Sequence, residues 1–265
     1  MNTMQNVAAG VEPAVLSTHG LTIRFGGHVA VNNVTAEFRP GTLTAIVGPN
    51  GAGKTTYFNL ISGQLPATSG SVKLYGEEVT HLGAAQRTRR GIGRAFQLTS
   101  LFPNLTVLEN VRLAVQSREG LGLNLLLLWS DHVEAIEKAE HFLHRVALAD
   151  RRRETASALS HGDKRKLEVA LLLALEPDIF MFDEPTAGMS VDEVPVVLEL
   201  IQHMKDQGDK TILLVEHKMD VVRSLADRIV VLHNGYLVAD GDPAEVMASP
   251  IVQEAYLGMG VAEHV

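Results

Sequence analysis

Hydrophobic residues follow two different periods along this chain. Apolar runs with little interruption occupy residues 42–47, 91–96, 179–182 and 211–215. Such runs are typical of parallel strands that other elements cover on both faces. Elsewhere apolar residues recur at i, i+3 and i+4, as at Tyr57, Leu60 and Ile61, which predicts helices. Strands that alternate with helices predict an α/β fold with a doubly wound sheet.

Two stretches depart from this alternation. Residues 14–40 carry short strand patterns separated by Gly, Asn and Pro, which predicts an antiparallel β-flap. Residues 99–157 are helical in pattern, with Thr106 as the expected cap of one helix, and predict an all-α insertion. The predicted division is a tail at 1–13, a core at 14–98 and 158–258, a helical subdomain at 99–157 and a tail at 259–265.

A glycine-rich segment joins the strand at 42–47 to the helix that begins at Lys54. Glycines let the backbone bend tightly and turn its N–H groups toward an anion, and the helix N-terminus adds positive partial charge. Lys54 would contact the β- and γ-phosphates of a nucleotide, and the Thr55 hydroxyl would ligate Mg²⁺. The predicted nucleotide-binding residues are Gly48, Pro49, Asn50, Gly51, Ala52, Gly53, Lys54, Thr55 and Thr56. The alternative is a glycine-rich turn before an ordinary helix.

Two carboxylates end the apolar run at 179–182. Ligands of open α/β sheets bind at the carboxyl ends of the strands. Asp183 is therefore expected to hold Mg²⁺, through water, and Glu184 to polarise an attacking water as general base. The alternative is that the pair starts a helix, for which Pro185 gives some support.

The segment Leu159-Ser160-His161-Gly162-Asp163 precedes another helical pattern. Ser160 and Asp163 have the spacing of a capping box, so alone the segment indicates no more than a capped helix. In a chain that also carries the phosphate loop, it resembles the signature of the ATP-binding-cassette (ABC) ATPases. The family's other motifs follow in the same order, with Gln97 and His217 each after an apolar run.

This resemblance covers about residues 14–258 and implies a P-loop NTPase fold with a RecA-like core. It implies hydrolysis of ATP to ADP and phosphate with Mg²⁺ as cofactor. The implied catalytic residues are Glu184, His217 and Gln97, and the implied metal ligands are Thr55, Gln97 and Asp183. Ser160 and Gly162 would act in trans, on the γ-phosphate held by a second ABC ATPase subunit, in a head-to-tail homodimer or heterodimer.

The resemblance also implies partners and a location. These are transmembrane permease subunits, a solute-binding protein indirectly, and the cytoplasmic face of the inner membrane. Within the family the chain is most similar to ATPases of branched-chain (hydrophobic) amino-acid importers. The features are the run Lys164 to Glu168, the segment Thr186 to Met189 and the ending Glu254 to Gly258. ATPases of urea and short-chain amide importers share several of these features. The alternative is therefore such an ATPase, or the ATPase of another ABC transporter.

Three features depart from the family's pattern. His161 and Asp163 replace the second Gly and the final Gln of the signature, and Ser190 stands at the D-loop aspartate position. The adenine-stacking tyrosine is matched only by Phe25. Phe25 either stacks on the base, without a hydrogen bond, or is an ordinary core residue.

Composition narrows the class of protein. With 265 residues, 46% hydrophobic and 20% charged, the chain is expected to be globular. A net charge of −8 argues against a nucleic-acid binder, and the absence of cysteine rules out disulfides. No stretch approaches the roughly 20 apolar residues of a membrane span, and residues 1–10 lack a secretory-signal pattern. Any membrane part is therefore expected on another polypeptide.

Two other functions fit the sequence less well than a transporter ATPase does. An ABC ATPase of a soluble system predicts two cassettes or a long coiled-coil insertion, and the chain has neither. A small-molecule kinase with a phosphate loop does not account for Ser160, Gly162 and His217. Separately, the apolar run Leu121–Trp129 either completes the core of the helical subdomain or docks the permease subunits.

Overall fold

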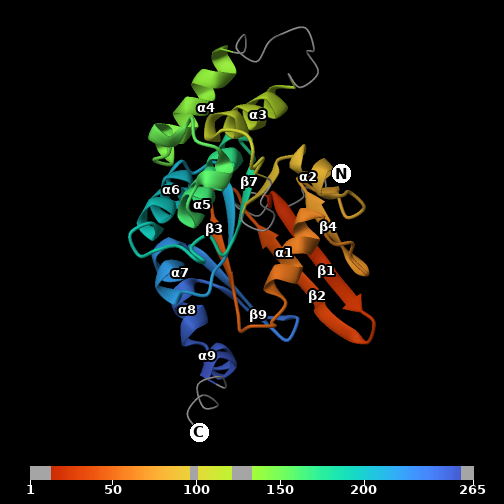
Figure 1. Ribbon diagram of the computed structural model, residues 1–265. Helices are drawn as coiled ribbons and strands as arrows, with labels where there is room; N and C mark the ends of the chain where they lie inside the picture. The colour runs from red at the N-terminus through yellow and green to blue at the C-terminus, as the bar shows by residue number, and fades with distance from the viewer. Residues whose placement is uncertain (1–12, 96–100, 121–132, 258–265) are drawn as a thin grey trace, which may run out of the picture.

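The computed structural model describes residues 13–95, 101–120 and 133–257, with the backbone only for residues 255–257. Two β-sheets and the helices around them make up this part of the chain (Figure 1). Gln97 and the run Leu121–Trp129 lie outside the described residues, so their roles stay predictions.

The larger sheet has six strands in the order β10-β9-β3-β8-β7-β6. These strands are β3 (Leu43–Val47), β6 (Ile92–Ala95), β7 (Ile179–Asp183), β8 (Thr211–Val215), β9 (Arg228–His233) and β10 (Tyr236–Gly241). All neighbours pair in parallel except β10, which is antiparallel to β9. Every residue of β3, β7 and β8 is buried, as the apolar runs predicted. Because these three strands are parallel neighbours, their carboxyl ends lie at one edge of the sheet.

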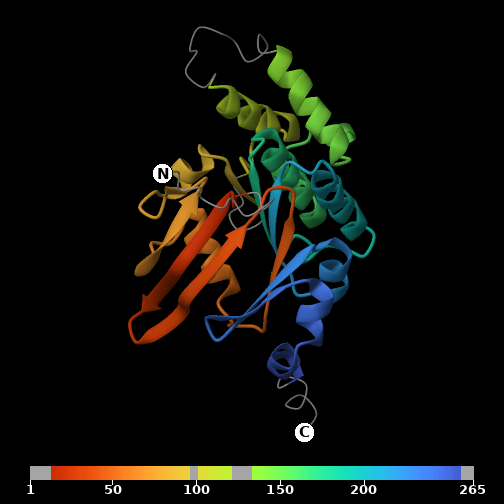
Figure 2. The ribbon, with the colours of Figure 1, turned by 180° about the vertical axis from the view of Figure 1, so that it is seen from behind.

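Helices cover both faces of this sheet (Figures 1 and 2). They are α1 (Lys54–Ser62), α5 (His161–Ala174), α6 (Val194–Asp206) and α7 (Met219–Leu225). Successive side chains of a strand point to opposite faces. Phe180 and Phe182 of β7 accordingly share a core cluster with α5 and α6, whereas Ile179 and Met181 share one with α1. This layering is the predicted α/β arrangement.

The smaller sheet is antiparallel and lies on the α1 side, with strand order β2-β1-β4-β5. Its strands are β1 (Leu16–Phe25), β2 (His28–Phe38), β4 (Ser69–Leu74) and β5 (Glu77–Glu78). The predicted β-flap supplies β1 and β2, and the other two strands come from beyond α1. The buried Tyr57 hydroxyl of α1 lies 2.8 Å from the Thr18 hydroxyl of β1, which joins helix to flap. α2 (Ala84–Thr88) leads from this sheet to β6.

The described residues of the predicted insertion, which lies between β6 and α5, form helices. It contains α3 (Val107–Glu119), α4 (Val133–Arg145) and the 3₁₀ turns η2 (Ala149–Arg151) and η3 (Ala156–Ala158). α3 and α4 pack on each other and on α5, at the top of Figure 1. α8 (Pro243–Ala248) and α9 (Pro250–Leu257) close the described part of the chain. Among the described helices, none has both the length and the apolar character to span a membrane.

Candidate functional site

The phosphate loop occupies the turn between β3 and α1, as predicted. Gly48 has φ 148° and Gly53 has φ 98°, values that side-chain-bearing residues rarely adopt. A Cβ would lie 2.1 Å from the Leu232 carbonyl oxygen at Gly48 and 2.4 Å from the Ala30 carbonyl oxygen at Gly53. The loop is thus pressed against β9 and β2, and only glycine fits at these two positions.

Lys54 is buried at the start of α1. Its ammonium donates hydrogen bonds to the carbonyl oxygens of Gly48, at 2.7 Å, and Pro49, at 2.9 Å. Burial lowers the pKa of Lys54 from its usual value, and the carboxylates of Glu184 and Asp183 act in the opposite direction. The loop therefore folds around a cation, and a phosphate is the kind of ligand that such a cation attracts.

Glu184 and His217, far apart in the sequence, meet in the structure. Their side-chain atoms Oε1 and Nε2 lie 2.8 Å apart, and both side chains are partly exposed. The Glu184 N–H donates to the Val215 carbonyl at 2.9 Å, and its φ is 53°. A left-handed backbone at a residue other than glycine costs about 1–3 kcal/mol and is concentrated at functional sites. Since the next helix begins only at Val194, Asp183 and Glu184 do not start a helix.

Glu216 is a functional neighbour that the sequence did not indicate. It is 4% exposed and accepts a 2.6 Å hydrogen bond from the Thr186 hydroxyl. Its other oxygen accepts from the backbone N–H groups of His217, at 2.9 Å, and Lys218, at 3.3 Å. The carboxylate thus fixes the loop of His217 against the segment after Glu184. The only signal in the sequence was a Glu between an apolar run and a His.

Asp183 ends β7 in contact with a second unpredicted residue, Arg94 of β6. Arg94 Nη2 lies 2.7 Å from Asp183 Oδ2, and each side chain is 6% exposed. Burial raises the pKa of Asp183, and the hydrogen bond and charge of Arg94 oppose that rise.

Oxygen ligands are present for the implied Mg²⁺. Magnesium prefers hard oxygens and usually takes only one or two from protein beside nucleotide phosphates. The Thr55 hydroxyl and the Asp183 carboxylate match that donor type. Among the described residues, no group of three or more His, Cys, Asp or Glu side chains is arranged to hold a metal ion.

Phe25 and the predicted nucleotide residues from Asn50 to Thr56 line one pocket of about 410 Å³, whereas Gly48 and Pro49 do not line it. Its lining residues are Phe25, His28, Ala30, Asn50, Gly51, Ala52, Gly53, Lys54, Thr55, Thr56, Glu184 and His217. Phe25 is 50% exposed at this pocket, so the interpretation of Phe25 as a core residue is wrong. The volume falls in the usual range of small-molecule sites, and the lining joins an anion cradle to a carboxylate–imidazole pair.

The signature segment lies outside this pocket. Ser160 is exposed and caps α5, its hydroxyl accepting from the Asp163 N–H at 3.1 Å. A Cβ at Gly162 would lie 1.9 Å from Glu193 Oε1, so the glycine makes room for that carboxylate. Glu193 in turn accepts from the N–H and the hydroxyl of Ser190, at 3.1 and 3.0 Å. Within one chain, therefore, Ser160 and Gly162 do not line the phosphate-loop pocket.

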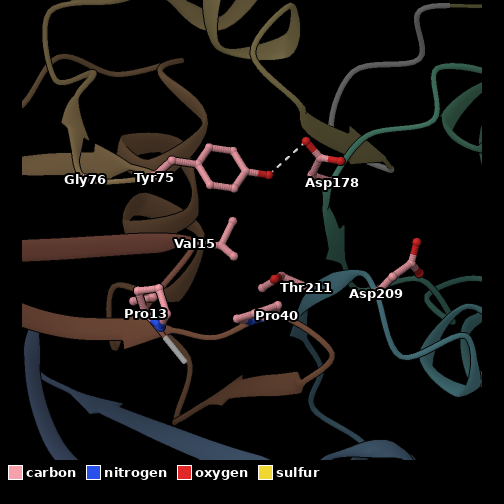
Figure 3. Close-up of a pocket in the computed structure, with 9 residues that line it drawn as sticks. Pro13, Val15, Pro40, Tyr75, Gly76, Asp178, Asp209 and Thr211 are labelled. Atoms are coloured by element: carbon pink, nitrogen blue, oxygen red, sulfur yellow. Dashed lines mark hydrogen bonds between the residues drawn. The ribbon is translucent and has the colours of Figure 1, made fainter. Parts of the chain in front are cut away.

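A second pocket, of about 630 Å³, lies where the amino-terminal ends of β7 and β8 meet the flap (Figure 3). Figure 3 shows the Tyr75 hydroxyl pointing at Asp178, to which it donates a 2.8 Å hydrogen bond. Asp209 and Thr211 lie on the other side of the pocket. None of the predicted site residues lines this second pocket.

Comparisons with known proteins agree with this geometry. The ABC transporter family model matches residues 31–187, and the model described as branched-chain amino acid ATP-binding cassette transporter matches residues 237–258. The high-affinity branched-chain amino acid transport ATP-binding protein LivG of Escherichia coli (strain K12) is 39% identical over 249 residues, 92% of this chain and 98% of that protein. BraF of Pseudomonas aeruginosa, which carries the same description, is 38% identical over 251 residues, again 92% and 98%.

Solved structures give the same result. A nucleotide-free ATP-binding cassette from an ABC transporter superposes with a TM-score of 0.78 at 27% identity, covering 92% of this chain and 98% of that one. An ATP-binding cassette in its ADP conformation gives 0.78 at 27% identity, with 93% and 100% covered. The predicted P-loop NTPase fold is thereby confirmed. The chain belongs to the ABC transporter family, as an ATP-binding subunit whose hydrolysis of ATP is coupled to transport.

Proposed function

We propose that this chain is the ATPase subunit of an importer for branched-chain or other hydrophobic amino acids. The observation that carries the proposal is the identity of 39% over 92% of the chain to LivG, which is described as a branched-chain amino acid transport protein. The match of residues 237–258 to a branched-chain amino acid transporter model supports it. The ATPase of a urea or short-chain amide importer is the alternative.

In the proposed mechanism the phosphate loop binds ATP. The backbone N–H groups of the loop and the Lys54 ammonium bind the phosphates, and Phe25 stacks on the adenine. Mg²⁺ held by Thr55 and Asp183, with Gln97 near it, would neutralise charge on the β- and γ-phosphates. Glu184 accepts a proton from the attacking water as general base. His217 would contact the γ-phosphate, and its Nε2 also lies 2.8 Å from the Glu184 carboxylate.

The proposal includes a second nucleotide-binding subunit. Ser160 and Gly162 stand at the N-terminus of α5, where a hydroxyl and a helix end favour an anion. Because they lie outside the pocket of their own chain, we propose that they reach the γ-phosphate bound by the partner ATPase. Permease subunits at the cytoplasmic face of the inner membrane would complete the assembly, with a solute-binding protein acting on the permease. The net charge of −8 is consistent with the absence of a nucleic-acid partner.

Uptake by whole cells tests the transported solute. A strain that lacks this subunit is expected to lose uptake of radiolabelled leucine, isoleucine and valine and to retain urea uptake. A plasmid copy of the wild-type subunit should restore uptake, and a copy with Glu184→Gln should not. Loss of urea uptake with normal leucine uptake would instead favour the urea and amide alternative.

A further inference from the structure

Arg94 is an arginine in the middle of β6, with its side chain only 6% exposed. Its guanidinium bridges two elements of the nucleotide site. On one side Nη2 donates to Asp183 Oδ2, at 2.7 Å, at the end of β7. On the other side Nη1 donates to Asn59 Oδ1, at 2.7 Å, and Ser62 Oγ, at 2.9 Å, both in α1.

Two further contacts fix the plane of this guanidinium. Gln64 Oε1, just beyond the end of α1, accepts from Nη1 at 3.4 Å. The guanidinium carbon also lies 5.4 Å from the centre of the Phe58 ring. Arg94 is therefore held from three sides, by β7, by α1 and by an aromatic ring.

The stability of the fold alone does not explain a buried arginine that is paired with a buried carboxylate. Taking an arginine and a carboxylate out of water costs several kcal/mol per ion, and well-packed apolar residues of similar volume often serve a fold equally well or better. Burial lowers the pKa of Arg94, because the charged guanidinium loses contact with water. Its Nε has no hydrogen-bond partner in the described part of the chain. The benefit must lie in the geometry that Arg94 imposes on its partners.

The geometry concerns Asp183. Arg94 donates to one oxygen of that carboxylate, Oδ2, and so restrains the direction in which the carboxylate points. The same guanidinium is tied to α1, the helix whose first residues are Lys54 and Thr55. Outer partners of this kind orient the groups that bind a metal and tune its affinity.

We propose that Arg94 is a positioning residue, which orients Asp183 toward magnesium-bound nucleotide and keeps it in register with the phosphate-loop helix. The inference rests on the proposed role of Asp183 in holding Mg²⁺. It assigns Arg94 no contact with the nucleotide.

Nucleotide binding at graded Mg²⁺ concentrations tests the proposal without relying on turnover. Fluorescent mant-ATP is titrated into wild-type chain and into Arg94→Met, first in EDTA and then over a range of Mg²⁺. In Arg94→Met the Mg²⁺ concentration for half-maximal enhancement of binding is expected to rise about 10–100-fold, the usual effect of removing an outer-shell partner. Binding in EDTA should change much less.

Arg87→Met is the matched control. Arg87 is also buried, at 2% exposure, and also reaches α1, donating to the Leu60 and Ile61 carbonyl oxygens at 2.6 Å. It has no contact with Asp183, so its removal should lower the unfolding temperature and leave the Mg²⁺ dependence unchanged. An equal shift in Arg87→Met would overturn the proposal, because loosening of α1 would then explain both variants. So would an unchanged Mg²⁺ dependence in Arg94→Met.

Two more variants keep the test decisive. If Arg94→Met does not fold, Arg94→Lys retains the charge but loses the planar fork that bridges both elements. Arg94→Lys should show a smaller shift in the same direction, and a wild-type Mg²⁺ dependence in this variant would contradict the proposal.

Asp183→Asn separates the role of Arg94 from the proposed magnesium role of Asp183. If Asp183→Asn shifts the Mg²⁺ dependence and both Arg94 variants do not, only the role of Arg94 fails. If Asp183→Asn has no effect either, the proposed magnesium role of Asp183 fails.

Discussion

At the scale of single residues, Glu184 combines a strained backbone with a precise side-chain contact. Its positive φ is maintained by the hydrogen bond from its N–H to Val215, and its carboxylate faces His217. The site therefore holds the Glu184 carboxylate at the sheet edge in contact with His217. Preorganisation of this kind favours proton transfer from a positioned water.

Replacement of Glu184 by Gln tests this role. Glu184→Gln keeps the shape but cannot accept the proton, so the rate of ATP hydrolysis should fall about 10²–10⁴-fold. Affinity for Mg·ATP should stay near the wild-type value, because Lys54, Thr55 and Asp183 are unchanged. Phosphate release gives the rate and calorimetry gives the dissociation constant. Hydrolysis close to the wild-type rate in this variant would remove Glu184 from the catalytic step.

Some site residues were predictable from the sequence and others were not, for a physical reason. The phosphate loop is local, since its glycines, lysine and threonine are consecutive and their chemistry follows from spacing. Arg94 and Glu216 act through partners 89 and 30 residues away, Asp183 and Thr186. An arginine within an apolar run gives no indication of its partner until the strands are paired. The contact of Phe25 with the pocket likewise depends on how the flap lies over α1.

At the scale of elements, the clearest local signal was the cap of α3. Thr106 Oγ1 accepts from the Glu109 N–H at 3.1 Å, and Glu109 Oε2 accepts from the Thr106 N–H at 2.8 Å. This reciprocal pair is the capping box that the sequence predicted in part, through Thr106 alone. At α5 only half of the pattern forms, because the Asp163 carboxylate pairs with Lys166 and Arg151 instead.

Thr106→Ala should destabilise the chain by about 1 kcal/mol, the usual loss for a helix cap. Hydrogen bonds from Thr106 lower the pKa of Glu109, so their contribution is complete above the ordinary glutamate pKa of about 4.3. The contribution is lost as the pH falls through the lower pKa of the folded state. Urea unfolding of wild type and Thr106→Ala at pH 7 and at acid pH measures the loss of unfolding free energy. Ser157→Ala, at an exposed position of the same subdomain, is the control. An equal loss at both pH values would contradict the capping-box account.

Strand pairing shows where element prediction stops. The buried strands β3, β7 and β8 follow from uninterrupted apolar runs, whose type and place the sequence gives directly. The addition of β4 to the flap does not follow from the sequence. In the pairing of β4 with β1, Leu16 lies opposite Leu74, and all of β3 and α1 lie between these two strands in the chain. Alternation of apolar and polar side chains predicts a strand, but it does not identify the strand that pairs with it.

At the scale of the whole molecule, the six-stranded sheet separates two core clusters, one beside the phosphate loop and one beside the signature segment. The core with α1 and the flap supports the phosphate loop. The core with α3, α4, α5 and α6 supports the helix that begins after Ser160. Within one chain Ser160 lies outside the pocket of the phosphate loop, which is why we propose that a second copy or a similar subunit, placed head-to-tail, completes the site.

Mixing two inactive variants tests that arrangement. In a dimer of Ser160→Arg with Lys54→Ala, one composite site carries both defects and the other carries neither. Hydrolysis should therefore reappear on mixing, although each variant alone is inactive. The matched control mixes Ser160→Arg with a chain that carries both changes, since no intact site can form in that pair. Activity of Ser160→Arg alone at the wild-type rate would reduce Ser160 to a helix cap. A mixture no more active than its control would exclude the head-to-tail pair for this chain with itself.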